Sequence, residues 1–223
     1  MMREGVASAL AAEPPKPLLR GTFHLAAAVA APFGLAVMLL LSRSPRAYVA
    51  SAIFGASLIA CYGVSAGYHL APWPRTLRGV VKRLDHAMIF ALIAGTYTPF
   101  CLIVLNNAWG ISILSAVWGL AAAGMLLKIA WPWAPRWLSV SLYLAVGWVA
   151  VVAVAPIASA LALAPLLLLI AGGVLYSVGA LIYAARWPDP FPRVFGYHEV
   201  FHLLVVAGGL IHFSIIAFYV LPS

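Results

Sequence analysis

A few titratable side chains stand inside a chain that is otherwise strongly apolar. The 223 residues are 65% hydrophobic and 8% charged, and the five acidic residues are Glu4, Glu13, Asp85, Asp189 and Glu199. His69, Asp85, His198 and His202 lie within or beside long apolar runs, where an ionisable group is costly and generally functional. Imidazoles are common metal ligands, and a carboxylate beside them can act as a base. These residue types therefore indicate metal-assisted chemistry.

The segment HEVFH carries two of these histidines. His198 and His202 are four residues apart, so on a helix they share a face about one turn apart. The letters also match HExxH, in which zinc peptidases use both histidines as ligands and the glutamate as a base. Such a peptidase needs a third downstream ligand, and no acidic residue follows Glu199. A peptidase is therefore a secondary interpretation, and Glu199 is left open between supporting the site and facing the membrane interface.

Seven apolar segments must position these side chains. They cover residues 23–41, 48–71, 84–105, 109–130, 137–161, 165–185 and 197–221, and each has about the 20 residues that cross a bilayer as a helix. The weakest break reads ALALA, between Pro156 and Pro165, and leaves six helices as the alternative. We predict an all-α integral membrane protein, with one seven-helix domain over residues 23–221 after a flexible cytoplasmic tail over residues 1–22.

The distribution of cations predicts the orientation of this bundle. With the amino terminus in the cytoplasm, eleven of the thirteen Lys and Arg residues fall in the tail and inner loops, and Arg43 and Arg46 fall outside. Because cytoplasmic loops carry the excess of Lys and Arg, we predict the amino terminus inside and the carboxyl terminus outside. The net charge of +8 then reflects topology and attraction to anionic lipids, and we expect no nucleic-acid partner.

This topology brings residues of three helices to one membrane depth. His69 ends the second segment, Asp85 begins the third, and His198 and His202 begin the seventh. Three neutral imidazoles plus water form a common zinc shell with an open position. We therefore predict zinc bound by His69, His198 and His202. Asp85 is placed to orient or deprotonate the water, and Ser65, four residues before His69, shares its helix face.

The other histidines are expected to play lesser parts. His86 points about 100° away from Asp85 on the same helix, which suits an interfacial or supporting position. His212 follows His202 by ten residues, or about 15 Å along a helix, too far to share the metal. His24, at the cytoplasmic edge of the first helix, is expected to contact lipid headgroups.

Small residues and one proline predict details of the packing. Gly63 and Gly67 form a GxxxG pattern, which allows close helix approach. Gly95 and Pro99 are expected to loosen or bend the third helix. Such a bend would open a lipid-sized cavity above the metal.

Three segments resemble a known family. SAGYHL (residues 65–70), KRLDHAMIFALIAGTYTPF (82–100) and FGYHEVFHLLVVAGGLIHF (195–213) resemble the hemolysin III proteins, the bacterial branch of the progestin and adipoQ receptor (PAQR) family. The specific signal is the ordered set S-x3-H, then D, then H-x3-H. The resemblance implies a seven-helix bundle with a cytoplasmic amino terminus. It also implies zinc ligands at His69, His198 and His202, with Asp85 holding a zinc-bound water and Ser65 in the same site.

The family suggests a class of reaction. Its wider group contains proposed membrane metal-dependent hydrolases; eukaryotic relatives resemble hormone receptors with ceramide-hydrolysing activity, and the bacterial branch is linked to membrane lipid homeostasis. We therefore predict a multi-pass cell-membrane protein that hydrolyses lipid amide or ester bonds, with Asp85 and Ser65 as catalytic residues and membrane lipids as partners. One alternative is a non-enzymatic membrane sensor with structural zinc, whose site would be closed by four protein ligands. The other alternative is a cytolysin.

Overall fold

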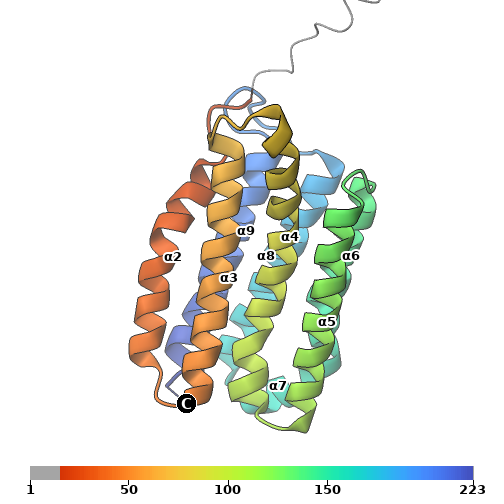
Figure 1. Cartoon of the computed structure of the whole chain (residues 1–223). Coiled ribbons are helices and arrows are strands. Elements are labelled where there is room, and N and C mark those ends of the chain that lie inside the picture. Colours follow the sequence, from red (N-terminus) through yellow and green to blue (C-terminus); the bar gives the residue numbers. More distant parts are fainter. Residues whose placement is uncertain (1–15, 223) are drawn as a thin grey trace, which may run out of the picture.

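The computed structural model describes residues 16–222, and within them seven helical spans are long and apolar enough to cross a membrane. They lie side by side in one bundle (Figure 1). The described residues form no β-strand, so the all-α class and the count of seven are confirmed. The elements are α2 (Thr22–Leu41), α3 (Pro45–Leu70), α4 (Arg75–Pro99) continued by η1 (Phe100–Leu105), α5 (Ala108–Ala130), α6 (Arg136–Gly147) continued by η2 (Trp148–Ala153) and α7 (Val154–Ala160), α8 (Leu163–Ala185), and α9 (Tyr197–Ile215) continued by η3 (Ile216–Val220).

The starts of two helices follow local signals in the sequence. The Ser44 hydroxyl accepts a hydrogen bond from the backbone N–H of Ala47 at 3.2 Å, and the Asn107 side chain accepts one from Gly110 at 3.0 Å. Each cap satisfies a backbone N–H that the first helical turn leaves unpaired. Pro45 occupies the first turn of α3, where a missing N–H costs nothing. These caps allow very short connections before α3 and α5.

One predicted boundary is wrong and one weak boundary is confirmed. α4 begins at Arg75, nine residues before the predicted start at Leu84. Hydropathy marks the apolar part of a helix only, and the first turns of α4 carry four Lys or Arg residues, which are compatible with a helix but not with hydrocarbon. The break at ALALA is real, because α7 ends at Ala160 and α8 begins at Leu163.

The helix that follows Asp85 changes form where a bend was predicted. Pro99 has no N–H to donate, and from Phe100 the chain continues as the π-helix η1. Gly95 has a different role from the one predicted. A Cβ at Gly95 would collide with the side chain of Ser57 in α3. This glycine therefore permits close packing of α3 on α4.

The close helix approach predicted for the GxxxG pattern is wrong. A Cβ added to Gly63 or Gly67 meets nothing within 4 Å among the described residues. α3 instead approaches α2 at Gly55, where a Cβ would collide with Leu35. It approaches α4 at Gly95 of that helix. The spacing of small residues selects a helix face, but it does not say which neighbour meets that face.

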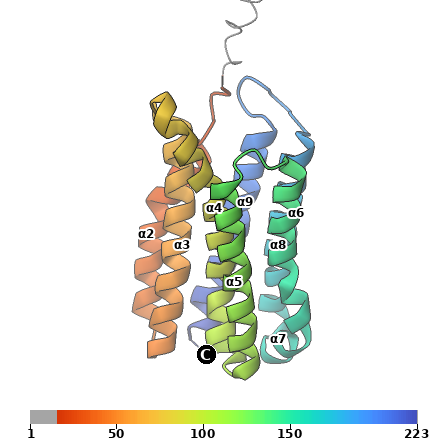
Figure 2. The ribbon, with the colours of Figure 1, turned by 45° about the vertical axis from the view of Figure 1, so that its right-hand side comes forward.

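The order of the helices in space brings the two ends of the chain together. α2 packs on α3, α3 on α4, α4 on α5, and α8 on α9. α9 also contacts α2, so the last helix returns to the first (Figures 1 and 2). The start of α9 therefore lies near the start of α2 and the end of α3.

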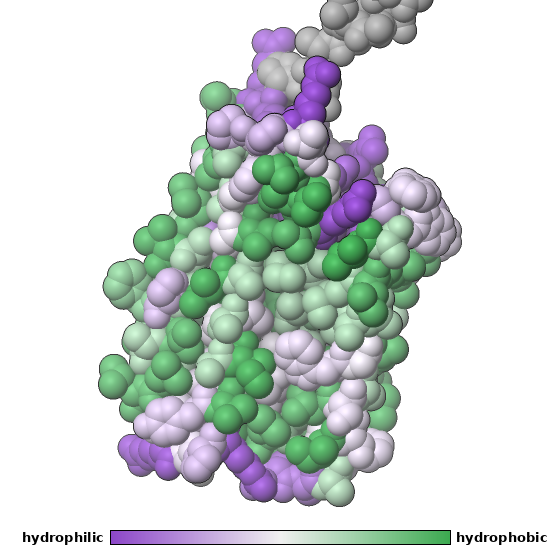
Figure 3. Space-filling model, viewed as in Figure 1, coloured by the Kyte–Doolittle hydropathy of each residue, from purple (hydrophilic) through white to green (hydrophobic). Residues whose placement is uncertain are grey.

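The outside of the bundle is apolar. Leu40 is 85% exposed, Phe33 71% and Leu163 70%. Figure 3 shows hydrophobic residues over the flank and hydrophilic residues gathered at the two ends. A surface of this kind suits the hydrocarbon of a bilayer, with the charged ends at the headgroups.

We predict that Gly110→Ala lowers stability and that Gly119→Ala, in the same helix, does not. A Cβ at Gly110 would lie 2.6 Å from the backbone oxygen of Cys101, whereas one at Gly119 meets nothing within 4 Å. Overpacking of this kind costs about 1–3 kcal/mol, because backbone cannot move aside easily. Thermal unfolding in detergent micelles would measure the difference, and equal midpoints for the two variants would contradict the prediction.

Candidate metal centre

Three histidines from distant parts of the sequence meet at one end of the bundle. We call it the His end; it also carries residues 16–21 and the loop between α8 and α9. His69 is the second-last residue of α3, and His198 and His202 belong to the first two turns of α9. One ring nitrogen from each lies within 4.8 Å of the others. The return of α9 to α2 and α3 therefore brings the three predicted ligands together.

The geometry of these rings fits a metal ion. Nε2 of His198 and Nε2 of His69 are 3.2 Å apart. Two nitrogens bound to one tetrahedral zinc at about 2.0–2.1 Å lie roughly 3.3 Å from each other. His69 and His202 are buried, and three neutral imidazoles leave one coordination position for water or substrate. The group could hold a metal ion, and zinc as its identity stays a prediction.

A hydroxyl and a carboxylate lie beside the three histidines. Ser65 is one turn before His69 on α3 and is buried. The Ser65 side chain interacts with Asp85 of α4, and both residues line the same cavity as His198 and His202. Among the described residues, the group of close ligand atoms contains no carboxylate. Asp85 is therefore a neighbour of the three histidines and not a fourth member of their group.

A largely apolar cavity of about 250 Å³ extends from this site into the bundle. Apolar side chains of several helices line it, among them Phe100, Ile157 and Leu169. Trp148 and Val151 also line it, and both are about half exposed on the outside of the bundle. One wall of the cavity is thus part of the lipid-facing surface. A cavity of the kind predicted above the metal is present, and Phe100 of the π-helix is part of its wall.

His24 does not contact lipid headgroups, so that prediction is wrong. The residue is 3% exposed, and its ring stacks on His202 with centroids 3.7 Å apart and planes 6° from parallel. The Tyr62 ring lies 5.2 Å away. Both ring nitrogens are buried without a hydrogen-bond partner in the described part of the chain. Helix α2 thus supports a ligand residue of α9, a contact that no local pattern in the sequence signals.

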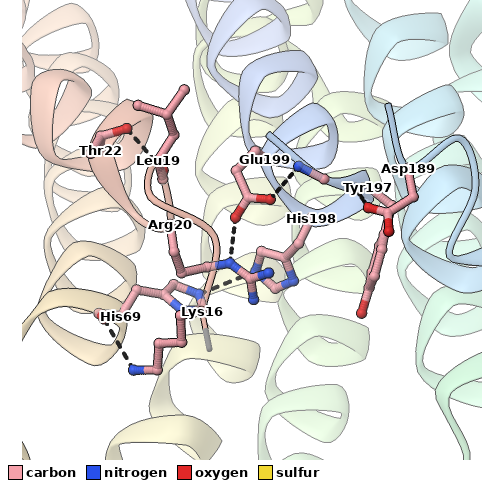
Figure 4. Close-up of polar contacts among 10 residues, drawn as sticks. Lys16, Leu19, Arg20, Thr22, His69, Asp189, Tyr197, His198 and Glu199 are labelled. Carbon is pink, nitrogen blue, oxygen red and sulfur yellow. Dashed lines mark hydrogen bonds and ion pairs between the residues drawn. The ribbon is translucent and has the colours of Figure 1, made fainter. Parts of the chain in front are cut away.

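Glu199 does not face the membrane interface, because its side chain is fully buried. One carboxylate oxygen accepts a hydrogen bond from Nε of Arg20, and the other accepts one from the backbone N–H of Gly196 at 2.8 Å (Figure 4). The second bond is the glutamate half of a capping box, in which the third helical residue accepts the backbone N–H of the N-cap residue, here Gly196. With both oxygens engaged, Glu199 is not the free base that an HExxH peptidase requires. It holds the turn that carries His198.

Residues 16–21, the N-terminal segment, contact the site from outside the bundle. Two backbone hydrogen bonds of 3.0 and 3.1 Å join the segment to the α8–α9 loop. The Lys16 ammonium donates to the backbone oxygen of His69 at 3.3 Å (Figure 4). Gly21 has φ +86°, and a Cβ there would lie 2.8 Å from Cβ of His69. Residues 1–15 of the predicted flexible tail lie outside the described residues.

The structure places the two remaining histidines outside the group of ligand atoms. Nε2 of His86 lies 3.3 Å from the Tyr183 hydroxyl, which suits the predicted supporting position. Nδ1 of His212 lies 2.9 Å from the backbone oxygen of Gly208, and its ring stacks on Tyr176 at 5.2 Å. Each of these histidines is therefore satisfied by its own neighbours.

Comparison with known proteins identifies the family of this chain. The family model described as "Haemolysin-III related" matches residues 13–213. The chain belongs to the haemolysin III family. It is 37% identical over 180 residues to Hemolysin-3 of Bacillus cereus, covering 79% of this chain and 78% of the relative. It is 37% identical over 172 residues to the Hemolysin-3 homolog of Bacillus subtilis (strain 168), covering 77% of each.

A plant protein connects this haemolysin III chain to a wider family. Heptahelical transmembrane protein ADIPOR2 of Oryza sativa subsp. japonica is 31% identical over 180 residues, covering 72% of this chain and 77% of the relative. This match agrees with the resemblance to the PAQR family. Together with the seven apolar spans, the family identifies a multi-pass membrane protein.

We predict that His202→Ala removes metal from this haemolysin III protein and that His86→Ala does not. His202 supplies one of three ligand nitrogens, and loss of even an outer-shell partner costs about 10–100-fold in metal affinity, so loss of a ligand costs more. His86 lines the same cavity and controls for loss of an imidazole. Elemental analysis of the purified variants would measure the metal. Equal metal in both variants would place the metal elsewhere.

We also predict that Gly21→Ala weakens metal binding and that Gly63→Ala leaves it unchanged. A side chain at Gly21 requires an unfavourable backbone conformation and pushes directly on His69 of α3. Gly63 also lies in α3, and a Cβ there meets nothing within 4 Å among the described residues. A displacement of about 1 Å at a ligand is enough to disturb coordination, because metal–nitrogen distances vary by only about 0.2 Å. Competition with a chelator would measure both affinities, and unchanged affinity in Gly21→Ala would show that the N-terminal segment does not position His69.

Proposed function

We propose that this haemolysin III family protein is a zinc-dependent hydrolase of lipid amide or ester bonds. The observation that carries the proposal is the meeting of three histidines, two of which line a largely apolar cavity together with Ser65 and Asp85. Three histidines with an open fourth position are typical of hydrolytic zinc sites. When bound there, zinc would polarise a carbonyl group and lower the pKa of a water molecule to about 7.

Each side chain of the site has its own role in the proposed hydrolysis. His69, His198 and His202 hold the metal. Asp85 accepts the proton of the attacking water as general base, a role that contributes typically 10²–10⁴-fold to a rate. Ser65 donates its hydrogen bond to the Asp85 carboxylate, which keeps that base in a fixed orientation, and it also orients the water or the substrate.

The cavity supports a lipid substrate. Its walls are predominantly hydrocarbon, and Trp148 and Val151 separate it from the surrounding lipid. An acyl chain can fill such a space, while the polar carbonyl lies at the His end. Burial of each methylene contributes about 0.8 kcal/mol, so the cavity favours long-chain substrates over short ones. Ceramides, other acyl amides and acyl esters fit this description.

We infer from the distribution of cations that the reaction takes place at the cytoplasmic leaflet. Ten of the twelve Lys and Arg residues between positions 16 and 222 belong to helix ends and loops of the His end, and Arg43 and Arg46 lie at the opposite end. The positive-inside rule assigns the cation-rich end to the cytoplasm. A hydrolase at this depth would act on lipids of the cell's own membrane, in keeping with a role in membrane lipid homeostasis.

The composition of the site favours this function over the alternatives. A structural zinc site is closed by four protein ligands, and in the described part of the chain the group has three. The names of the Bacillus relatives refer to haemolysis. A cytolysin has to leave the membrane of the producing cell, and seven lipid-facing helices oppose that step.

We predict that Asp85→Asn abolishes lipid hydrolysis and retains the metal. Asparagine keeps the size of the side chain but cannot accept a proton, so turnover should fall by about 10²–10⁴-fold. Asp189→Asn is the matched control, because Asp189 caps α9 through an oxygen that asparagine keeps. Release of fatty acid from ceramide, acyl-amide and ester lipids would be measured with metal-loaded protein. The proposal fails if the wild type hydrolyses none of these lipids, or if Asp85→Asn hydrolyses them as fast as the wild type.

A further inference from the structure

A second polar site lies at the His end, between α5 and α6. Lys128 is in the last turn of α5 and is only 5% exposed. Its ammonium donates a hydrogen bond to Oγ of Ser139 at 2.6 Å, which uses one of its three N–H donors. A buried cation is costly unless an opposite charge pairs with it. The Lys128 ammonium therefore requires an anion close to it.

No described carboxylate serves as that anion. The Asp85 carboxylate interacts with Ser65 and Lys82, and Glu199 is paired with Arg20. Asp189 accepts the backbone N–H at the start of α9. The described residues between positions 16 and 222 contain no other acidic side chain. The positive charge of Lys128 is thus balanced by no protein carboxylate in this part of the structure.

The neighbours of Lys128 add further positive charge. Ser139 belongs to the first turns of α6, and the N-cap residue of that helix, Pro135, provides no side-chain hydrogen bond to it. A helix N-terminus carries the equivalent of about half a positive charge and presents free N–H groups to an anion. Lys82 of α4 interacts electrostatically with Lys128 as well. Two of these features, the Lys128 ammonium and the start of α6, meet at Ser139, and a bound anion would stabilise both.

The surrounding side chains indicate where this anion comes from. Trp131, Trp133 and Trp137 lie in or beside the loop between α5 and α6 and are 37%, 77% and 65% exposed. Exposed tryptophans gather at the level of the lipid headgroups. Figure 2 shows this loop at the same end of the bundle as the α8–α9 loop. We therefore expect the headgroup phosphates of the surrounding leaflet at the level of this loop, which follows Lys128.

We propose that Lys128, held in place by Ser139, and the N-terminus of α6 bind the phosphate of a phospholipid headgroup. The lipid's acyl chains lie along the apolar outside of α5 and α6, and its phosphate reaches the ammonium from the headgroup layer. The site uses no residue of the metal centre and does not depend on the hydrolase proposal. It binds a lipid that remains intact and fixes the depth at which this end of the bundle sits.

The test is lipid binding to the full-length protein in detergent micelles, measured by native mass spectrometry. The probes are dioleoylphosphatidylglycerol, dioleoylglycerol with the same chains but no phosphate, and inorganic phosphate. Hydrogen bonds to charged groups are strong enough that loss of Lys128 should weaken phosphatidylglycerol binding by about tenfold or more. We expect this loss in Lys128→Met and in the more polar Lys128→Gln, and retention of binding in Lys128→Arg.

Arg75→Met is the matched control. It removes one exposed cation from the same end of the bundle and should leave phosphatidylglycerol affinity unchanged, which separates a specific site from general attraction to anionic lipid. Wild-type affinity in Lys128→Met and Lys128→Gln would overturn the proposal. So would equal binding of dioleoylglycerol and phosphatidylglycerol. Binding of inorganic phosphate as tightly as of phosphatidylglycerol would assign the site to free phosphate and overturn the lipid assignment.

Discussion

The hydrocarbon of the bilayer offers no water to a buried polar group, and this constraint governs where such groups lie in the protein. An unpaired polar group in an apolar medium costs several kcal/mol. The chain meets this cost by placing most charged side chains at the two ends of the bundle and by giving Glu199 and Lys128, which are buried there, hydrogen-bond partners. Glu199 is the extreme case, since it is fully buried and both of its oxygens accept hydrogen bonds. The metal centre is built around this paired carboxylate.

Helix α9 links the fold to the site. Its first turns carry His198 and His202, and they are held on three sides: by Glu199 and Arg20 at the helix start, by the stacked ring of His24 from α2, and by contact of the histidine rings with one another. Removal of one partner from a buried ion pair typically costs about 3–5 kcal/mol. The geometry of the ligands therefore depends on the N-terminal segment as much as on α9 itself.

The irregular parts of the helices lie where the bundle has to leave space. The π-helix η1 and the 3-10 helix η2 both contribute to the cavity wall, through Phe100 and Trp148 respectively. Regular helices packed along their whole length close such spaces, whereas a local change of helical form redirects side chains. Glycines close space instead of leaving it, because Gly95 and Gly110 allow neighbouring segments to approach closely. The polar centre at the His end thus opens into an apolar space that is bounded by packed helices.

The sequence by itself determined the helical class, the number of spans and the three histidines that could hold a metal ion. Hydrophobic length decides what crosses a bilayer, and alternation of the helices then forces His69, His198 and His202 to one end. The sequence did not determine how far α4 extends, because charged turns can continue a helix beyond the hydrocarbon. The tertiary structure decided the places of His24 and Glu199. Stacking on His202 and pairing with Arg20 require α2, α9 and the N-terminal segment to meet, and the pairing of distant segments leaves no periodic signal in a single sequence.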